Sequence, residues 1–169
     1  MSSNLQLTEV DVMDAALLQD LSDLLLAVVD EGASVGFLPQ LSKDVAQRYW
    51  EGVLGEGVLL WIAKKNDRLC GTIQLHLSQK ENGVHRAEIA KLMVHPDQRQ
   101  KGIGRALMKT VESRAVLECR TLLVLDTHYG DPLNVLYRSE GYVEAGTIPR
   151  YAKSANGDLD ATLIFYKKI

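Results

Sequence analysis

The stretch from Arg86 to Leu107 (RAEIAKLMVHPDQRQKGIGRAL) constrains the fold most, because it predicts a strand, a turn and a helix in direct succession. Its first nine residues alternate between two faces, as in a β-strand: Arg86, Glu88, Ala90, Leu92 and Val94 on one face, and Ala87, Ile89, Lys91 and Met93 on the other. Pro96 ends the strand, since proline has no N–H for the ladder and restricts the residue before it. A buried helix face follows, with apolar residues at four-residue spacing: Ile103, Leu107, Val111 and Ala115.

The turn between this strand and this helix, residues 97–104, is polar and contains Gly102 and Gly104. Backbone N–H groups at a helix start are unpaired and carry a partial positive charge, so such a turn suits a phosphate. The P-loop pattern does not match, because no Gly-Lys-Ser/Thr sequence follows the glycines, and the dinucleotide fingerprint fails at Leu107. Two interpretations stay open on the residues alone: a phosphate-binding turn of another kind, or an ordinary turn with a solvated basic face formed by Arg99, Lys101 and Arg105.

The other patterns predict an α/β protein with a mixed sheet, formed by a single domain over residues 1–169. Helices are expected at about 14–29, 42–54, 103–118 and 131–141, and a loop at 31–37 because two glycines interrupt the helical spacing. Strands are expected at about 5–7, 58–63, 69–77, 86–94, 121–127, 143–151 and 160–167.

The composition argues against several classes of protein. A net charge of −3 gives no reason to expect a nucleic-acid partner. No apolar run reaches the length that spans a membrane, and the first residues lack the pattern of a signal peptide. Cys70 and Cys119 form neither a metal-binding spacing nor a disulfide framework, so both are expected to be reduced and buried, with no metal bound. A cytoplasmic enzyme is the simplest interpretation.

The motif Arg99-x-x-Gly102-x-Gly104, placed after a strand and Pro96, resembles that of the GCN5-related N-acetyltransferases (GNAT). Their second signature is similar to residues 134–142 (NVLYRSEGY), where Leu136 replaces a frequent Phe. The resemblance covers nearly the whole chain and implies the GNAT acyl-CoA N-acyltransferase fold, a mixed central sheet flanked by helices. Several stretches look closer to the bacterial tabtoxin-resistance-type acetyltransferases: GASVGF at 32–37, RAEIAKLMV at 86–94, LLVLDT at 122–127 and GTIPRY at 146–151.

This resemblance implies acetyl-CoA as co-substrate. The pyrophosphate would be bound by the turn and the start of its helix, at Arg99, Gln100, Lys101, Gly102, Ile103, Gly104 and Arg105. A side chain at Gly102 or Gly104 would block the close approach of the backbone to the phosphate. The pantetheine arm would pair with the backbone of Leu92, Met93 and Val94, where one N–H faces the acetyl oxygen.

Two residues of the second signature are expected at the cofactor. Tyr137 is the candidate general acid for the departing sulfur, and Asn134, one turn earlier, would contact the cofactor. The alternative for Tyr137 is a tyrosine that only packs in the core of an amphipathic helix.

The acceptor amine must lose a proton, because an amine with a pKa of about 10.4 is almost fully ammonium at neutral pH. Glu88 and Asp126 are the candidate catalytic carboxylates, with Glu88 favoured as base and Asp126 as the residue that orients the amine. Alternatively, Glu88 forms an ion pair with Arg86, or Asp126 is a buried cap of the following turn. Among the histidines, His128 is noted because it follows Asp126 closely.

The loop between the first two helices is expected to form a wall of the substrate site, with Glu31, Ser34, Val35 and Phe37 joining Asp126. The expected acceptor is a primary amine of a small molecule, an amino-acid-like metabolite or toxin, and the resemblance allows for a homodimer. Two other functions stay open: acetylation of protein N-termini or lysines, and a non-catalytic acetyl-CoA-binding module.

Overall fold

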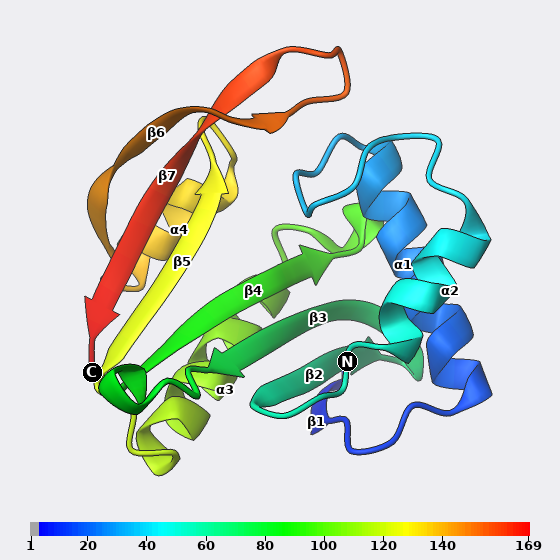
Figure 1. The fold of residues 1–169 in the computed structure, drawn as a ribbon. Coiled ribbons are helices and arrows are strands. Elements are labelled where there is room, and N and C mark those ends of the chain that lie inside the picture. Colours follow the sequence, from blue (N-terminus) through cyan, green and yellow to red (C-terminus); the bar gives the residue numbers. More distant parts are fainter. Residues whose placement is uncertain (1–3) are drawn as a thin grey trace.

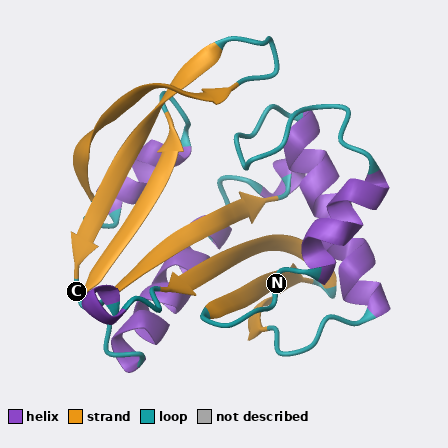
Figure 2. Cartoon of the chain, in the orientation of Figure 1, coloured by secondary structure: helices purple, strands orange, loops and turns teal. Residues whose placement is uncertain are grey.

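A computed structural model describes residues 4–169, which form one seven-stranded sheet and four α-helices (Figures 1 and 2). The strands are β1 (Leu5–Glu9), β2 (Val58–Lys65), β3 (Arg68–Leu77), β4 (Arg86–Val94), β5 (Leu122–His128), β6 (Val143–Lys153) and β7 (Leu159–Lys168). The helices are α1 (Ala15–Asp30), α2 (Lys43–Glu51), α3 (Ile103–Leu117) and α4 (Leu133–Ser139), with short 3₁₀ helices η1 (Glu81–Gly83) and η2 (Pro96–Gln98).

The strands lie in the order β1-β2-β3-β4-β5-β7-β6. Only β4 and β5 are parallel, and every other neighbouring pair is antiparallel. The predicted α/β class with a mixed sheet is therefore confirmed. The last strand lies between β5 and β6, which leaves β6 at the edge of the sheet (Figure 1).

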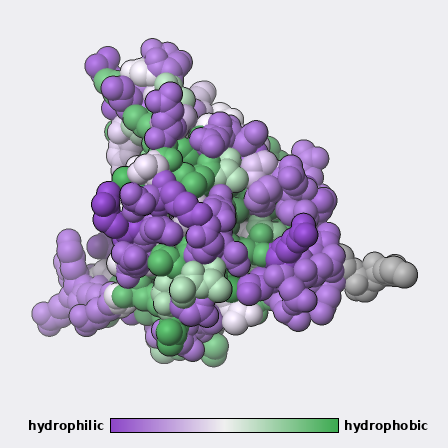
Figure 3. Space-filling model, turned by 90° about the vertical axis from the view of Figure 1, so that its right-hand side faces the viewer, coloured by the Kyte–Doolittle hydropathy of each residue, from purple (hydrophilic) through white to green (hydrophobic). Residues whose placement is uncertain are grey.

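Helices cover both faces of the sheet. Helices α1 and α2 share one core with the sheet, whose members include Leu21, Leu25, Trp50, Leu60 and Met93. Helices α3 and α4 share the other core, which includes Ile73, Leu107, Met108, Leu123 and Tyr137. The outer surface seen from the α1 and α2 side is mostly hydrophilic, as expected for helices whose apolar stripes face the sheet (Figure 3).

Strand β4 contains a bulge at Lys91, where φ is +54°. The neighbouring residues show the extra residue directly: on β3, Thr72 and Gln74 are two apart, yet they pair with Met93 and Ala90, which are three apart. Two residues of β4 thus lie opposite one residue of β3, which defines a β-bulge.

The bulge changes which residues share a face of β4. Ile89 and Leu92 both pack in the α3 core, although three positions separate them, and Met93 packs with α1 and α2. Val94 also packs against the α3 core. The predicted strict alternation, which placed Leu92 and Val94 on the face of Glu88, is therefore wrong beyond the bulge.

The two cysteines differ in exposure. Cys70 is buried as predicted, but Cys119 is exposed, so that prediction is wrong for Cys119. Cys119 follows the end of α3 with a φ of +55°, and the chain there turns along the surface. None of the helices formed by residues 4–169 has the length and apolar character that crossing a membrane requires.

Candidate active site

Strands β4 and β5 pair only near their starts. Their ladder runs from the Arg86–Leu122 pair to the Glu88–Val124 pair, and the described chain shows no further pairing between them. Figure 1 shows the two strands diverging toward their carboxyl ends. The β5-facing edge of residues 89–94 therefore has no strand partner, which suits an extended ligand that bonds to backbone groups. This segment includes the residues predicted to pair with pantetheine: Leu92, Met93 and Val94.

The start of α3 has no side-chain cap. Gly102 occupies the cap position with a φ of +79°, whereas the side chains of Asp14 and Ser42 cap α1 and α2. The first backbone bond of α3 joins the N–H of Ala106 to the Gly102 carbonyl at 3.0 Å. The N–H groups of 103–105 precede that bond and belong to the unpaired set that every helix start carries. A Cβ added to Gly102 would meet no atom within 4 Å, so the backbone is open to a ligand.

The cationic side chains near this helix start are partly engaged elsewhere. Arg105 forms an ion pair with Glu140 and donates to Ser139 Oγ at 3.1 Å, which links α3 to the end of α4. Lys101 Nζ donates to the Asp97 carbonyl at 2.8 Å. To contact a phosphate, Arg105 would have to release or share Glu140, and Lys101 would have to release or share the Asp97 carbonyl.

The remaining residues of the turn differ in what they present. Arg99 and Gln100 are exposed, while the Ile103 side chain is buried in the core, so only its backbone faces outward. A Cβ on Gly104 would lie 3.2 Å from Leu136 Cδ2. Packing of α3 against α4 thus also favours a glycine at 104, and the role of Gly104 in phosphate binding stays a prediction.

Tyr137 lies on α4 with its ring in the core, 5.9 Å from the Phe165 ring centroid and 6.2 Å from that of Tyr142. Burial raises the pKa of the Tyr137 hydroxyl, and the charges of Asp131 and Asp126 raise it further. The hydroxyl therefore stays protonated at neutral pH, as a proton donor requires.

Asn134 is buried on α4, one turn before Tyr137. Its Nδ2 donates to the backbone carbonyl of His128 at 3.2 Å, but its Oδ1 is buried with no hydrogen-bond partner in the described chain. A buried acceptor without a partner is costly, so it points to a donor supplied by a ligand. An amide N–H of a pantetheine arm is such a donor.

The register places Glu88 and Asp126 on the same face of the sheet. Glu88 is paired with Val124, and side chains on a strand repeat every second residue, so Asp126 follows on that face. Both side chains are exposed. Among the ion pairs formed by residues 4–169, none joins Glu88 to Arg86. Partial burial raises the pKa of Glu88, and the charge of Asp126 raises it further, while Lys91 opposes both effects. The interpretation of Asp126 as a buried cap is wrong, because its side chain is exposed.

Lys91 is a functional candidate that sequence reasoning missed. The bulge turns it to the side of α1 and α2, where Nζ donates to the Val35 carbonyl at 2.6 Å. Nζ also lies 5.9 Å from the ring centroids of both Phe37 and Tyr49. Burial lowers the pKa of Lys91, while Asp126 and Glu88 act in the opposite direction. Lys91 therefore fixes the loop between α1 and α2 beside the two carboxylates.

A cavity of about 310 Å³ opens between this loop, the end of β5 and the turn of the β6–β7 hairpin. Of the predicted substrate-binding residues, Ser34 and Phe37 line it, whereas Glu31, Val35 and Asp126 do not. Glu31 is the exposed C-terminal cap of α1. The hairpin wall includes Lys153 to Asn156 and Asp160, none of which the sequence patterns indicated.

Comparison with known proteins identifies the family. Residues 18–142 match the model of the acetyltransferase (GNAT) family. The chain belongs to this family. This match confirms the predicted GNAT fold. The predicted type of enzyme, an acetyltransferase, is the type for which this family is named. Among curated relatives, the UPF0157 protein YqkA of Bacillus subtilis is 32% identical over 105 residues, which are 62% of this chain and 28% of that protein. The chain therefore spans less than a third of the length of this relative.

Solved GNAT structures share the fold over nearly the whole chain. The ribosomal-protein-alanine N-acetyltransferase of Brucella melitensis has a TM-score of 0.79 at 18% identity, covering 97% of this chain and 99% of that one. An aminoglycoside 6'-N-acetyltransferase complexed with coenzyme A has a TM-score of 0.76 at 20% identity, covering 96% of each chain. Because one of these acts on a ribosomal protein and the other on an aminoglycoside, the shared fold does not fix the acceptor.

Proposed function

We propose that this GNAT protein transfers the acetyl group of acetyl-CoA to a primary amine of a small, amino-acid-like molecule within a ternary complex. The proposal rests on one observation: pairing between β4 and β5 ends at the Glu88–Val124 pair. An unpaired backbone edge begins there, and Glu88 and Asp126 lie on one face beside it. An edge that binds the thioester arm and carboxylates that attract an ammonium group are the two parts such a transfer needs.

The residues that would hold acetyl-CoA fit its chemistry. The open N-terminus of α3 suits the pyrophosphate, the free edge at 92–94 suits the amides of the pantetheine arm, and Asn134 Oδ1 suits one further N–H. When bound, acetyl-CoA supplies an activated acetyl group as a thioester. A backbone N–H near Met93 or Val94 would polarise its carbonyl.

The acceptor side supplies charge and a base. Glu88 and Asp126 attract the ammonium group, and Glu88 takes its proton, directly or through a water, helped by a pKa above that of an ordinary carboxylate. Asp126 orients the amine. Tyr137, kept neutral by burial, delivers a proton to the departing sulfur.

The dimensions of the acceptor cavity favour a small molecule. Its volume of about 310 Å³ lies at the low end of small-molecule sites, and its wall combines the loop after α1 with the β6–β7 hairpin. This favours a small amine over a protein N-terminus or lysine. The tabtoxin-resistance subgroup, the cytoplasmic location and a homodimer stay predictions.

A screen by thiol release tests the proposed function. Acetyl-CoA is incubated with the protein and each of a panel of amines: free amino acids, amino-acid analogues, spermidine and kanamycin. We expect release of coenzyme A with one or a few amino-acid-like amines. Acetylation of a peptide N-terminus or lysine in place of every small amine would favour the protein acetyltransferase, and acetyl-CoA binding without turnover would favour the non-catalytic module.

Gly102→Val is expected to raise the dissociation constant of acetyl-CoA at least about tenfold. Loss of one hydrogen bond to a charged phosphate costs about 1.5–3 kcal/mol, and a β-branched residue cannot adopt the φ of +79° without strain. Calorimetric titration with acetyl-CoA measures the effect. Gly157→Val is the matched control, because Gly157 also has a positive φ and open space around its Cα, but lies in the β6–β7 turn. If Gly102→Val, Gly157→Val and the parent bind acetyl-CoA with equal affinity, the proposed phosphate site at the start of α3 is rejected.

Lys91→Met is expected to raise the Michaelis constant for the acceptor roughly three- to tenfold, because one charge-assisted hydrogen bond to the loop is lost. Since Lys91 lowers the pKa of Glu88, its removal should also move the acidic limb of turnover to higher pH. Steady-state kinetics across pH measures both effects. The exposed Lys109 provides the control variant Lys109→Met. Parent-like values in Lys91→Met would exclude Lys91 from fixing the loop.

A further inference from the structure

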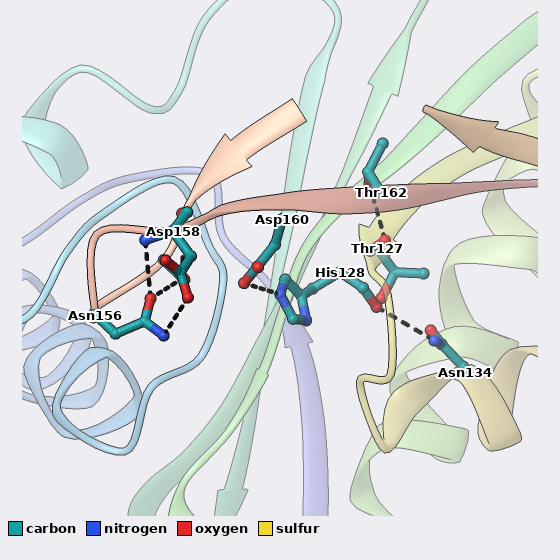
Figure 4. Close-up of polar contacts among 8 residues, drawn as sticks. Thr127, His128, Asn134, Asn156, Asp158, Asp160 and Thr162 are labelled. Atoms are coloured by element: carbon teal, nitrogen blue, oxygen red, sulfur yellow. Dashed lines mark hydrogen bonds and ion pairs between the residues drawn. The ribbon is translucent and has the colours of Figure 1, made fainter. Parts of the chain in front are cut away.

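A second candidate for proton transfer lies at the wall of the acceptor cavity, away from Glu88. His128, the last residue of β5, and Asp160 on β7 both line the cavity, and His128 Nε2 lies 2.8 Å from Asp160 Oδ2 (Figure 4). Both side chains are about one-third exposed, at 30% and 34%. The hydrogen bond from His128 lowers the pKa of Asp160, so Asp160 is a carboxylate at neutral pH.

This pairing sets the tautomer of His128. A carboxylate only accepts hydrogen bonds, so Asp160 requires the proton of a neutral imidazole to be on Nε2. The lone pair is then on Nδ1, which has no hydrogen-bond partner within residues 4–169. An imidazole held by a carboxylate through one nitrogen and open at the other is arranged as a general base.

The register places His128 on the same face of the sheet as Glu88. Glu88 is paired with Val124, and the side chains of Asp126 and His128 follow on the same face of β5. Beyond the Glu88–Val124 pair the two strands diverge, so His128 lies at the end of β5 on one side of the divergence and residues 92–94 lie at the end of β4 on the other. The backbone carbonyl of His128 also accepts from Asn134 Nδ2 at 3.2 Å (Figure 4).

The carboxylates alone are poorly suited to remove both of the protons that an ammonium group loses on becoming an amide. Opposite charges favour the charged form of an amine, so Glu88 and Asp126 make the ammonium group harder to deprotonate while they bind it. A free imidazole, with a pKa of about 6.5, is a stronger base than a free carboxylate, with a pKa of about 4. A nearby imidazole would therefore complement the two carboxylates.

We propose that His128, positioned by Asp160, is a second proton acceptor for the amine, which acts from the β5 side of the cavity while Glu88 acts from β4. This inference rests on the proposed function. The ammonium group loses two protons on becoming an amide. His128 Nδ1 takes the first, the freed lone pair bonds to the acetyl carbon as the carbon–sulfur bond breaks, and Glu88 takes the second. Tyr137 protonates the sulfur and is reprotonated from solvent, and His128 and Glu88 return their protons to solvent.

Few other titratable groups face His128. Lys153 on β6 and Asp160 on β7 line the same cavity, and the loop at 32–39 contributes none to its wall. Asp126 lies two residues earlier on β5, on the same face. Lys153, Asp160 and Asp126 are therefore the other groups whose charge can affect the pH dependence that we attribute to His128.

His128→Gln tests the proposal, because the glutamine amide still donates to Asp160 but cannot accept a proton. With the most active amine of the panel, we expect turnover near neutral pH to fall roughly tenfold, with the Michaelis constant nearly unchanged. The deficit should shrink as the pH approaches the amine pKa of about 10. His85→Gln, at an exposed histidine before β4, is the matched control and should behave as the parent.

Nitrogen NMR of the histidine ring provides a test that needs no acceptor. The parent should show His128 with its proton on Nε2, and Asp160→Asn should lose this preference and also lower turnover. If His128→Gln matches an active parent across pH 6 to 9, the inference is rejected while the proposed function stands. If the parent acetylates no amine of the panel, the proposed function itself is rejected.

Discussion

Glu88→Gln is expected to lower turnover by roughly 10²-fold near neutral pH, because the amine loses its nearest base on β4. The parent should lose turnover as the pH falls through the raised pKa of Glu88, since the base must be ionised. The variant should lack this acidic limb, and its deficit should shrink at high pH, where free amine becomes available. Turnover and the Michaelis constant measured across about pH 6 to 9 provide the test.

Asp126→Asn serves as the comparison for Glu88→Gln. Asp126 lies on the same face and has the same charge, but it is assigned to orienting the amine, so its loss should raise the Michaelis constant with turnover nearly kept. Parent-like kinetics of Glu88→Gln at every pH would exclude Glu88 from both roles. The reverse pattern, with turnover lost only in Asp126→Asn, would exchange the two assignments.

Tyr137→Phe should lower turnover by roughly 10²-fold, the low end for loss of a general acid, because a thiolate is already a fair leaving group. Burial keeps the pKa of Tyr137 above that of a free tyrosine, so the hydroxyl stays protonated and the deficit should be constant across pH 6 to 9. Acetyl-CoA affinity should be nearly unchanged, as calorimetry would show.

Tyr142→Phe is the matched control for this variant. Tyr142 belongs to the same aromatic cluster, and its buried hydroxyl has no partner in the described chain. Its substitution removes an equivalent hydroxyl without removing the proposed acid. If both variants lose turnover equally, or if neither does, Tyr137 contributes packing rather than a proton.

The element order was predictable from the sequence because local signals agree with the fold. Caps and spacing mark α1 and α2, where Asp14 and Ser42 accept backbone hydrogen bonds at 2.8 Å and 3.3 Å. The turn at 97–104 follows Pro96, contains two glycines and precedes an apolar helix face, and it leads to the uncapped helix start found in the structure. These features depend on residues close together in the sequence.

The bulge at Lys91 was not predictable, because its residues fit an unbroken alternation. Only pairing with β3 reveals the extra residue, and this pairing depends on a strand about twenty positions away. Its consequence is functional: Lys91 reaches the Val35 carbonyl, and Leu92 packs on the face opposite Glu88. A single bulge thus brings a cation beside the proposed acceptor site.

The pair formed by His128 and Asp160 was equally inaccessible to sequence reasoning. The two residues are 32 positions apart and meet because β7 pairs with β5. Asn134 was only partly predictable. Its motif indicated a cofactor contact, but only the structure shows that its buried Oδ1 has no hydrogen-bond partner in the described chain. Contacts of this kind depend on strand order, which local patterns do not specify.

Amide hydrogen exchange with and without acetyl-CoA tests the central claim most directly, which is that acetyl-CoA binds along the free edge of β4 and at the start of α3. At saturating acetyl-CoA, we expect slower exchange at the backbone amides of 92–94 and 99–105, with β1 and β2 unchanged. Binding that leaves both segments unprotected, or that protects a different face of the sheet, would contradict this account.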